Sequence, residues 1–339
     1  MVTIKDLARL AGVSPTTVSN VLHDRTEKVS PETLIKVQQV IKETKYVSNM
    51  GGRLLAKHGS RIISVILTEG HRDEINVTQS PFMSEIIGSL EESIRSNGYF
   101  MMLYTSADYE ESIRLATAWN TEGLIVLGST PKDAQRFIDE SPIPMVFIDT
   151  YLDGENPTFY NVGLLDYEGS KMMTKYLFAK GCRKVAFLAD WPEPVGVDLE
   201  RLKGFQAAYR EEGFSYDEEY FIPIDYRREV RHAMLREFAK GRMRNFDALF
   251  FSSDFYAVDS MNLLFELGFD VPRDISVVGF DNNILAEQSR PRLTTINQNT
   301  SSKGHLAVEM LVALLQQEKI NQKNVMLPVS LVQGKSVKS

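Results

Sequence analysis

Two short helical patterns separated by a tight turn begin the chain. Apolar residues recur at helical spacing over residues 4–11 and again over residues 15–22. Thr3 and Asp6 have the spacing of a capping box, which predicts that the first helix begins directly after Thr3. Gly12 lies between the two patterns, and glycine readily adopts the left-handed conformation of a tight turn. The sequence therefore predicts a helix pair at this end of the chain.

The second helix of this pair presents a polar face. We expect Ser14 to cap it and Pro15 to occupy its first turn, where no amide hydrogen is needed. The positions turned away from the apolar stripe carry short polar side chains: Thr16, Thr17, Asn20 and His23. This pattern is typical of a helix-turn-helix whose second helix enters a DNA major groove. The alternative is a small helical hairpin at the edge of a larger fold.

A third helix and a connector follow the pair. Ser30 and Pro31 predict the start of a helix that ends near Tyr46. Residues 48–60 combine good helix formers with glycines, each of which costs a helix about 1 kcal/mol. We predict a marginal helix in this connector, which forms only when something holds it.

From Arg61 onward, buried-type strands alternate with amphipathic helices. We expect strands at 62–67, 99–104, 124–127, 145–148, 184–188, 220–224, 248–251 and 275–278, a late helix at 301–317 and a final strand at 325–332. Such alternation predicts parallel sheets covered by helices on both faces. Two halves of this kind, each of Rossmann-like α/β architecture, are expected to have a ligand-binding cleft between them.

Charge is distributed unevenly along the 339 residues. The whole chain carries a net charge of −7, but residues 1–60 hold 9 Lys and Arg against 5 Asp and Glu, a balance of +4. The remaining residues hold 29 against 40, a balance of −11. A basic head on an acidic body confines phosphate contacts to the head.

The absence of targeting signals and the single cysteine favour a cytoplasmic, nucleoid-associated protein. No run of about 18 apolar residues is present, which predicts that no segment spans a membrane. The first residues lack the apolar core of a signal peptide. The lone cysteine, Cys182, cannot form an internal disulfide, which suits a reducing compartment.

Several motifs resemble the LacI/GalR family of bacterial transcription regulators. In the head these are Thr3-Ile-Lys-Asp-Leu-Ala, Ala11-Gly-Val-Ser, Thr17-Val-Ser and Val29-Ser-Pro-Glu-Thr. In the body they are Arg201-Leu-Lys-Gly-Phe, Pro272-Arg-Asp-Ile-Ser-Val-Val-Gly-Phe-Asp and Leu293-Thr-Thr-Ile. The resemblance implies a helix-turn-helix domain at 1–47, a hinge at 48–60 and a periplasmic-binding-protein-like effector and dimerisation domain at 61–339. Within that domain it places an N-subdomain at about 61–160 and 292–321 and a C-subdomain at about 161–291 and 322–339.

The same resemblance implies a homodimer that binds a pseudo-palindromic operator in double-stranded DNA. The DNA-binding residues that it implies are Thr3, Ser14, Pro15, Thr16, Thr17, Ser19, Asn20, His23, Asn49, Arg53 and Leu55. Among them Pro15, Thr16 and Asn20 would read bases, and asparagine pairs well with adenine. Leu55 matches a leucine that the family's hinge helix inserts into the minor groove. Gly51 and Gly52 weaken this expectation, because together they cost a helix about 2 kcal/mol.

The family's effector positions fall on strand ends that face the cleft. By resemblance they are Phe82, Met83, Asp149, Arg201, Ser253, Asp254 and Asp281. Trp191, just after the strand that ends at Leu188, is added because its ring could stack on the apolar face of a sugar. Alternative roles remain open for four of these residues: Phe82 as core, Trp191 as cover of the cleft edge, and Asp254 and Asp281 as helix caps. The polar loop 69–81 is longer than usual for the family, and its role stays open.

These expectations favour a repressor of carbohydrate-use genes, controlled by a sugar or glycoside in the cleft. A nucleobase effector, or a phosphorylated carrier protein as co-repressor, remains an alternative. An enzyme is disfavoured because the sequence lacks phosphate-cradling glycine loops, a nucleophile elbow and metal-ligand spacing. We accordingly expect no cofactor, no metal and no catalytic residue. The absence of leucine heptads near the end of the chain favours a dimer over a tetramer.

Overall fold

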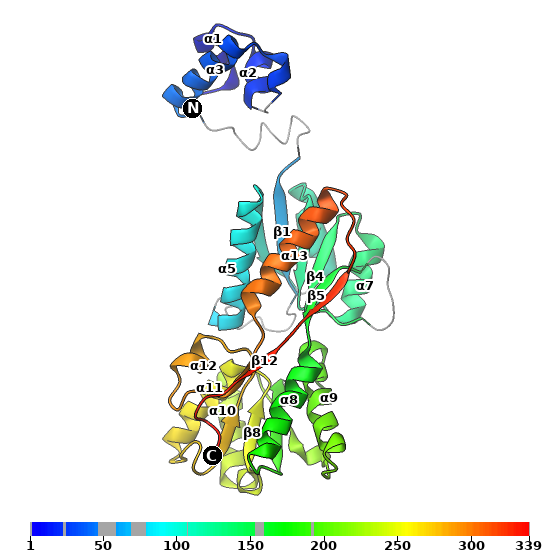
Figure 1. The fold of residues 1–339 in the computed structure, drawn as a ribbon, viewed down its shortest axis with the longest axis vertical. Helices are drawn as coiled ribbons and strands as arrows, with labels where there is room; N and C mark the ends of the chain where they lie inside the picture. Colours follow the sequence, from blue (N-terminus) through cyan, green and yellow to red (C-terminus); the bar gives the residue numbers. More distant parts are fainter. Residues whose placement is uncertain are drawn as a thin grey trace. The chain divides into compact units, whose positions relative to one another are not determined.

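The structure is a computed structural model that describes residues 2–22, 25–46, 59–68, 79–106, 108–152, 159–190 and 193–338. The chain divides into two compact units, residues 1–60 and residues 61–339. We refer to them as the head and the body (Figure 1). Within the described part of the chain, no helix is both long and apolar enough to cross a membrane.

The head contains the predicted helix pair and a third helix. Its elements are α1 (Ile4–Ala11), α2 (Pro15–Leu22), the 3-10 turn η1 (Thr26–Lys28) and α3 (Pro31–Thr44). The capping box is confirmed, since Thr3 accepts from the amide of Asp6 while the Asp6 carboxylate accepts from the amide of Thr3. Gly12 ends α1 with φ of 63°, the left-handed conformation expected of the turn.

A small apolar core holds the three helices of the head together. Leu7, Val18 and Val37, one from each helix, are fully buried against one another. The apolar faces predicted for the helices therefore point into this core, and the polar face of α2 lies outside it.

The first half of the body contains a six-stranded parallel sheet in the order β11-β5-β4-β3-β1-β2. Its strands are β1 (Ile62–Leu67), β2 (Phe100–Thr105), β3 (Gly123–Leu127), β4 (Met145–Ile148), β5 (Asn161–Leu164) and β11 (Asn324–Leu327). Its helices are α5 (Pro81–Ser96), α6 (Tyr109–Ala118), α7 (Pro131–Glu140) and α13 (Thr300–Leu315). Helices α5 and α13 lie side by side against this sheet (Figure 1).

The second half contains a four-stranded parallel sheet in the order β7-β6-β8-β9. Its strands are β6 (Val185–Asp190), β7 (Phe221–Ile224), β8 (Ala248–Phe251) and β9 (Ser276–Val278). The helical elements around it are α8 (Asp166–Ala179), α9 (Gly196–Glu211), η3 (Glu218–Tyr220), α10 (Arg228–Lys240), η4 (Arg242–Asn245), α11 (Asp254–Glu266) and α12 (Ile284–Gln288). A short antiparallel pair, β10 (Thr295–Asn297) with β12 (Ser330–Val332), lies beside β9 through single bridges.

The C-terminal strand expected at 325–332 is two strands that serve different sheets. β11 pairs with β5 in the first sheet, whereas β12 pairs with β10 at the second (Figure 1). The expectation of one strand was wrong because Pro328 interrupts the ladder between them. β5 and β10 were missed, and β5 places residues 161–164 with the first half, past the boundary expected at about 160.

The chain consequently crosses between the halves three times, after β5, after β10 and after β11. Periodicity alone did not reveal these crossings, because β5, β10 and β12 have only three or four residues each. The two halves are therefore joined by three separate segments of the chain.

Close packing of α8 on α9 depends on Gly204. A Cβ built at this position would lie 2.1 Å from the backbone oxygen of Tyr167 on α8. We predict that Gly204→Ala lowers the free energy of unfolding by about 1–3 kcal/mol, because the two helices must separate. Thermal or urea unfolding measures the change.

Gly88→Ala is the matched control, because a Cβ on Gly88 of α5 would meet nothing within 4 Å. It should stabilise by about 0.5–1 kcal/mol through helix propensity. Equal stability of the two alanine variants would contradict the packing argument.

Candidate functional site

The polar face of α2 is the candidate DNA-reading surface of the head. Pro15 and Thr16 are exposed, and Asn20 is half-buried on the same helix. Ser14 caps α2, because its hydroxyl accepts from the amide of Thr17 at 3.0 Å. The side chains of Ser14 and Thr17 also bond to each other at 2.9 Å, so both hydroxyls take part in the helix start.

Only some of the remaining candidate DNA-binding positions lie among the described residues. Thr3 is exposed but belongs to the capping box of α1, and Ser19 is half-buried. Four positions lie outside the described residues: His23, Asn49, Arg53 and Leu55. The expectations for the hinge at 48–60 therefore stay predictions.

A cavity of about 190 Å³ lies in the body and is lined from both halves. From the first half come the start of α5 and Asp149, which follows β4. From the second come Asp190 at the end of β6, Ser252 after β8 and Asp281 after β9. The cavity thus lies at the carboxyl ends of parallel strands, where α/β sheets commonly bind ligands.

Six of the eight expected effector residues line this cavity: Phe82, Met83, Asp149, Arg201, Ser253 and Asp281. Asp254 does not line it, and Trp191 lies outside the described residues. Loop 69–81 is described only from Gln79 onward, and Gln79, Ser80 and Pro81 line the cavity. Among the residues that the structure describes, no group of His, Cys, Asp or Glu side chains is arranged to hold a metal.

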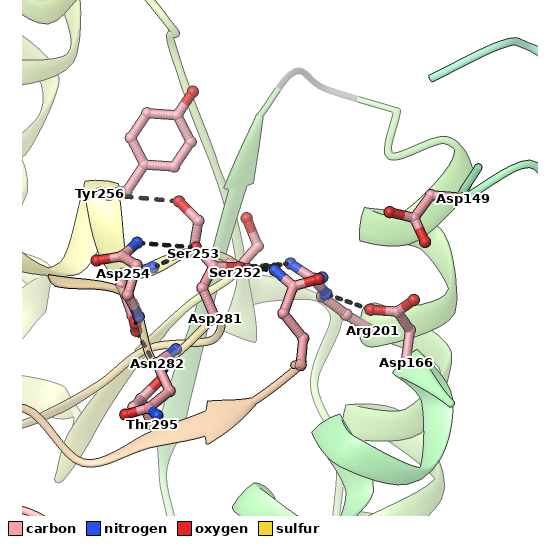
Figure 2. A network of polar contacts seen from close by, with 12 residues as sticks. Asp149, Asp166, Arg201, Ser252, Ser253, Asp254, Tyr256, Asp281, Asn282 and Thr295 are labelled. Carbon is pink, nitrogen blue, oxygen red and sulfur yellow. Dashed lines mark hydrogen bonds and ion pairs between the residues drawn. The ribbon is translucent and has the colours of Figure 1, made fainter. Parts of the chain in front are cut away.

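Arg201 is the buried cation that the second half contributes to the lining of the cavity. Its side chain is only 6% exposed, and its Nε donates to Asp166 Oδ1 at 2.7 Å. A terminal nitrogen donates to the backbone oxygen of Ser252 at 2.5 Å, and the guanidinium lies 3.8 Å from the ring centroid of Phe280. Figure 2 shows Arg201 between Asp166 and the Ser252 loop. Burial opposes its charge, but Asp166 and Asp281 hold the pKa of Arg201 above its ordinary value.

Asp281 is fixed by donors on both carboxylate oxygens. Its Oδ1 accepts from Gln298 Nε2 at 2.6 Å, and its Oδ2 accepts from the amide of Asp254 at 3.3 Å. Burial raises the pKa of Asp281 well above its usual range, and neighbouring Asp254 adds to the shift. The backbone of Asp281 has φ of 135°, which residues other than glycine rarely adopt, and such strain is often found at functional sites.

Asp254 has a structural place behind the cavity. Its carboxylate accepts from the hydroxyl of Thr295 at 2.6 Å (Figure 2). It also accepts from the amide of Asn283 at 3.1 Å. It is not the cap of α11, because Ser253 occupies that position and accepts from the amide of Tyr256 at 3.4 Å. Asp254 therefore ties the start of α11 to the segment that carries Asp281.

Asp149 is the carboxylate that the first half contributes to the lining of the cavity. It has φ of 54°, and both of its carboxylate oxygens accept from Lys303 Nζ, at 2.7 and 2.8 Å. Burial raises the pKa of Asp149, although Lys303 opposes that shift. Sequence reasoning missed Lys303, because a lysine in an otherwise apolar helix is read as solvent-exposed.

Several lining residues were also missed, and the spacing of motifs gave no sign of them. They are Asp190, Val197, Asp198, Ser252, Phe255, Tyr256, Asn283 and Gln298. The hydroxyl of Tyr256 donates to Asp190 at 2.7 Å. The position of Asp190 at the end of a buried strand was a usable signal, because parallel strands direct their carboxyl ends to one edge of the sheet.

A helical head with a polar helix face outside its core, joined to a two-halved α/β body with a cavity, is the architecture expected of a DNA-binding transcriptional regulator. Comparison with known families agrees with this class. Residues 3–49 match the family described as bacterial regulatory proteins, lacI family, and residues 174–337 match a periplasmic binding protein-like domain.

Similar proteins extend the match over the whole chain. The HTH-type transcriptional repressor PurR of Vibrio vulnificus (strain CMCP6) is 30% identical, covering 100% of this chain and 99% of the relative. A transcriptional regulator CelR–cellobiose complex is 26% identical with a TM-score of 0.73, covering 99% and 100%. A lac repressor dimer bound to operator and the anti-inducer ONPF shares the fold, at 24% identity and a TM-score of 0.85, covering 100% and 99%. The chain belongs to the LacI family of DNA-binding transcriptional regulators, which confirms the resemblance and the fold class.

Asp254 makes stability depend on pH. Burial raises its pKa from 3.8 to about 6, so the native state holds this proton more tightly than the unfolded chain. The stabilisation from this group is therefore complete below about pH 4 and is lost as the pH rises through about 6. We predict that its contribution to the free energy of unfolding falls by about 1–3 kcal/mol between pH 4.5 and pH 7.5.

Asp254→Asn removes this titration. Urea unfolding of wild type and variant at both pH values should show that the variant is relatively more stable at pH 7.5 than at pH 4.5. A difference between the two proteins that is the same at both pH values would contradict the assignment.

Proposed function

We propose that this regulator is a homodimeric repressor of carbohydrate-use genes, and that a neutral sugar in the body's cavity changes its affinity for a palindromic operator. The observation that carries the proposal is the cavity itself. Among the residues that the structure describes, carboxylates from both halves of the body line it together with the guanidinium of Arg201, and aromatic side chains accompany them. Polar groups with fixed orientation beside aromatic faces are how a site selects a sugar.

The charges of the cavity favour an uncharged effector. Asp149, Asp190, Asp198 and Asp281 line it, and the lining cation Arg201 is already paired with Asp166. A phosphate or carboxylate group would meet these carboxylates at short range in a poorly solvated site. A sugar offers hydroxyl groups without that repulsion. Cellobiose, the ligand in the CelR complex, is a neutral sugar of this kind.

A homodimer is supported by the edge of the first sheet. β2 is an edge strand, and its Phe100 and Leu103 are 54% and 39% exposed. Exposed apolar side chains on an unpaired edge favour association with a second copy. Two heads in one dimer double the phosphate contacts and match the symmetry of a palindrome.

The proposal is tested by selecting the preferred sites of the full-length protein from random double-stranded DNA. We expect a palindromic site with two half-sites. Its dissociation constant should then change at least about fivefold with D-ribose, D-glucose or cellobiose, as is typical of coupled sites. Ribose 5-phosphate should have no such effect. A response to a nucleobase, or only to a phosphorylated carrier protein, would favour the alternative regulators.

Asn20→Ala tests the reading face in the same assay. It should weaken the selected site by about 1–3 kcal/mol and relax the preference at one base pair of each half-site. Gln38→Ala, on the exposed side of α3, is the matched control and should leave the selected sequence unchanged. Equal losses on selected and random DNA for Asn20→Ala would show that Asn20 does not read bases.

A further inference from the structure

A buried lysine that no sequence motif singled out lies next to the cavity. Lys303 is in the first turns of α13, and its side chain is only 1% exposed. Burying an ammonium group is costly unless partners take up all of its hydrogens. Its Nζ reaches Asp149 Oδ1 at 2.8 Å, Asp149 Oδ2 at 2.7 Å and Gln298 Oε1 at 3.0 Å.

These three contacts use the three donors that a lysine ammonium has. Lys303 is therefore placed to orient its partners and not to bind an effector itself. The same Nζ lies 5.4 Å from the ring centroid of Phe82, which lines the cavity.

The contact with Lys303 determines which way Gln298 points. Because lysine only donates, the oxygen of the Gln298 amide must face it, and the amide nitrogen must face Asp281. Hydrogen bonds thus run in one direction, from Lys303 through Gln298 to Asp281. At the two ends of this chain, Asp149 in the first half and Asp281 in the second both accept hydrogen bonds from protein side chains and line the cavity.

We infer that Lys303 is a positioning residue that sets the hydrogen-bond polarity of the effector cavity, so that the effector must donate hydroxyl hydrogens to Asp149 and Asp281. This inference rests on the proposed sugar-binding function and deepens it. A polyol fits such a site because each hydroxyl can donate. A ligand edge made of carbonyl or ring-nitrogen acceptors would face the oxygens of Asp149 and Asp281 without a hydrogen between them.

Lys303→Met tests this role, because methionine has a similar length but no donor. Binding of D-ribose, D-glucose and cellobiose to the full-length protein is measured by calorimetry. We expect the probe that binds wild type to bind the variant about tenfold more weakly or worse, which corresponds to losing a charge-assisted contact. Lys175→Met is the matched control: this surface lysine of α8 is also ion-paired, with Glu211 and Glu212, and its loss should leave binding unchanged.

Measuring Tm at two pH values distinguishes a role of the Lys303 charge from a role of its side chain in packing alone. In the described part of the chain, the charged or titratable groups that act on Asp149 include Lys303 of α13, Asp166 of α8, Arg201 of α9 and Tyr151. Without Lys303, ionised Asp149 loses its ion-pair partner, so its folded-state pKa rises further and stability falls as the pH increases. The loss of Tm in Lys303→Met relative to wild type should therefore be several degrees larger at pH 8 than at pH 5.

Adding Asp149→Asn to Lys303→Met should remove the extra pH dependence without restoring probe binding. This double variant also serves if Lys303→Met alone does not fold. A Tm loss that is the same at both pH values would overturn the inference, as would wild-type affinity in either variant. If no neutral sugar binds wild type, the proposed effector class fails and this inference fails with it. If wild type and Lys303→Met bind a sugar equally well, only the role of Lys303 fails.

Discussion

Charges that are buried in the body must be paired, and the cavity is built on two such pairs. Asp149 is held by Lys303 and Asp166 is held by Arg201, each with a closest contact of 2.7 Å. Removing one partner of a buried pair is far more costly than the pair is stabilising, because it leaves an isolated charge away from water. These pairs therefore act less as a source of stability than as a constraint on where each carboxylate points.

This constraint connects the two halves of the body. Asp149 follows a strand of the first sheet, Asp281 follows a strand of the second, and Gln298 lies on one of the three connections between them. A ligand that binds both carboxylates has different contacts when the halves are closer together or farther apart. Such differential binding is the only way in which a ligand can shift a conformational equilibrium. Strained backbones at Asp149 and Asp281 indicate that the surrounding packing determines both conformations.

Local signals were sufficient to predict the head and most of the body. The capping box at Thr3, the turn at Gly12 and the long buried strands follow from neighbouring residues, and the structure contains all of them. The features that the sequence did not predict depend on contacts between residues far apart in the chain. The division of the last strand into β11 and β12 requires knowledge of which sheet each part joins. Lys303 is 154 positions from Asp149, and no spacing rule relates them.

In our interpretation the cavity presents hydrogen-bond acceptors to its effector from both halves of the body. Sugar analogues test this directly, because fluorine has nearly the size of a hydroxyl but cannot donate a hydrogen. Calorimetry should compare the sugar that binds wild type with its deoxy and deoxyfluoro analogues at each position in turn. At two or more positions, we expect the fluoro analogue to lose as much affinity as the deoxy analogue. Fluoro analogues that bind as tightly as the parent sugar at every position would show that the cavity does not select its effector through these acceptors.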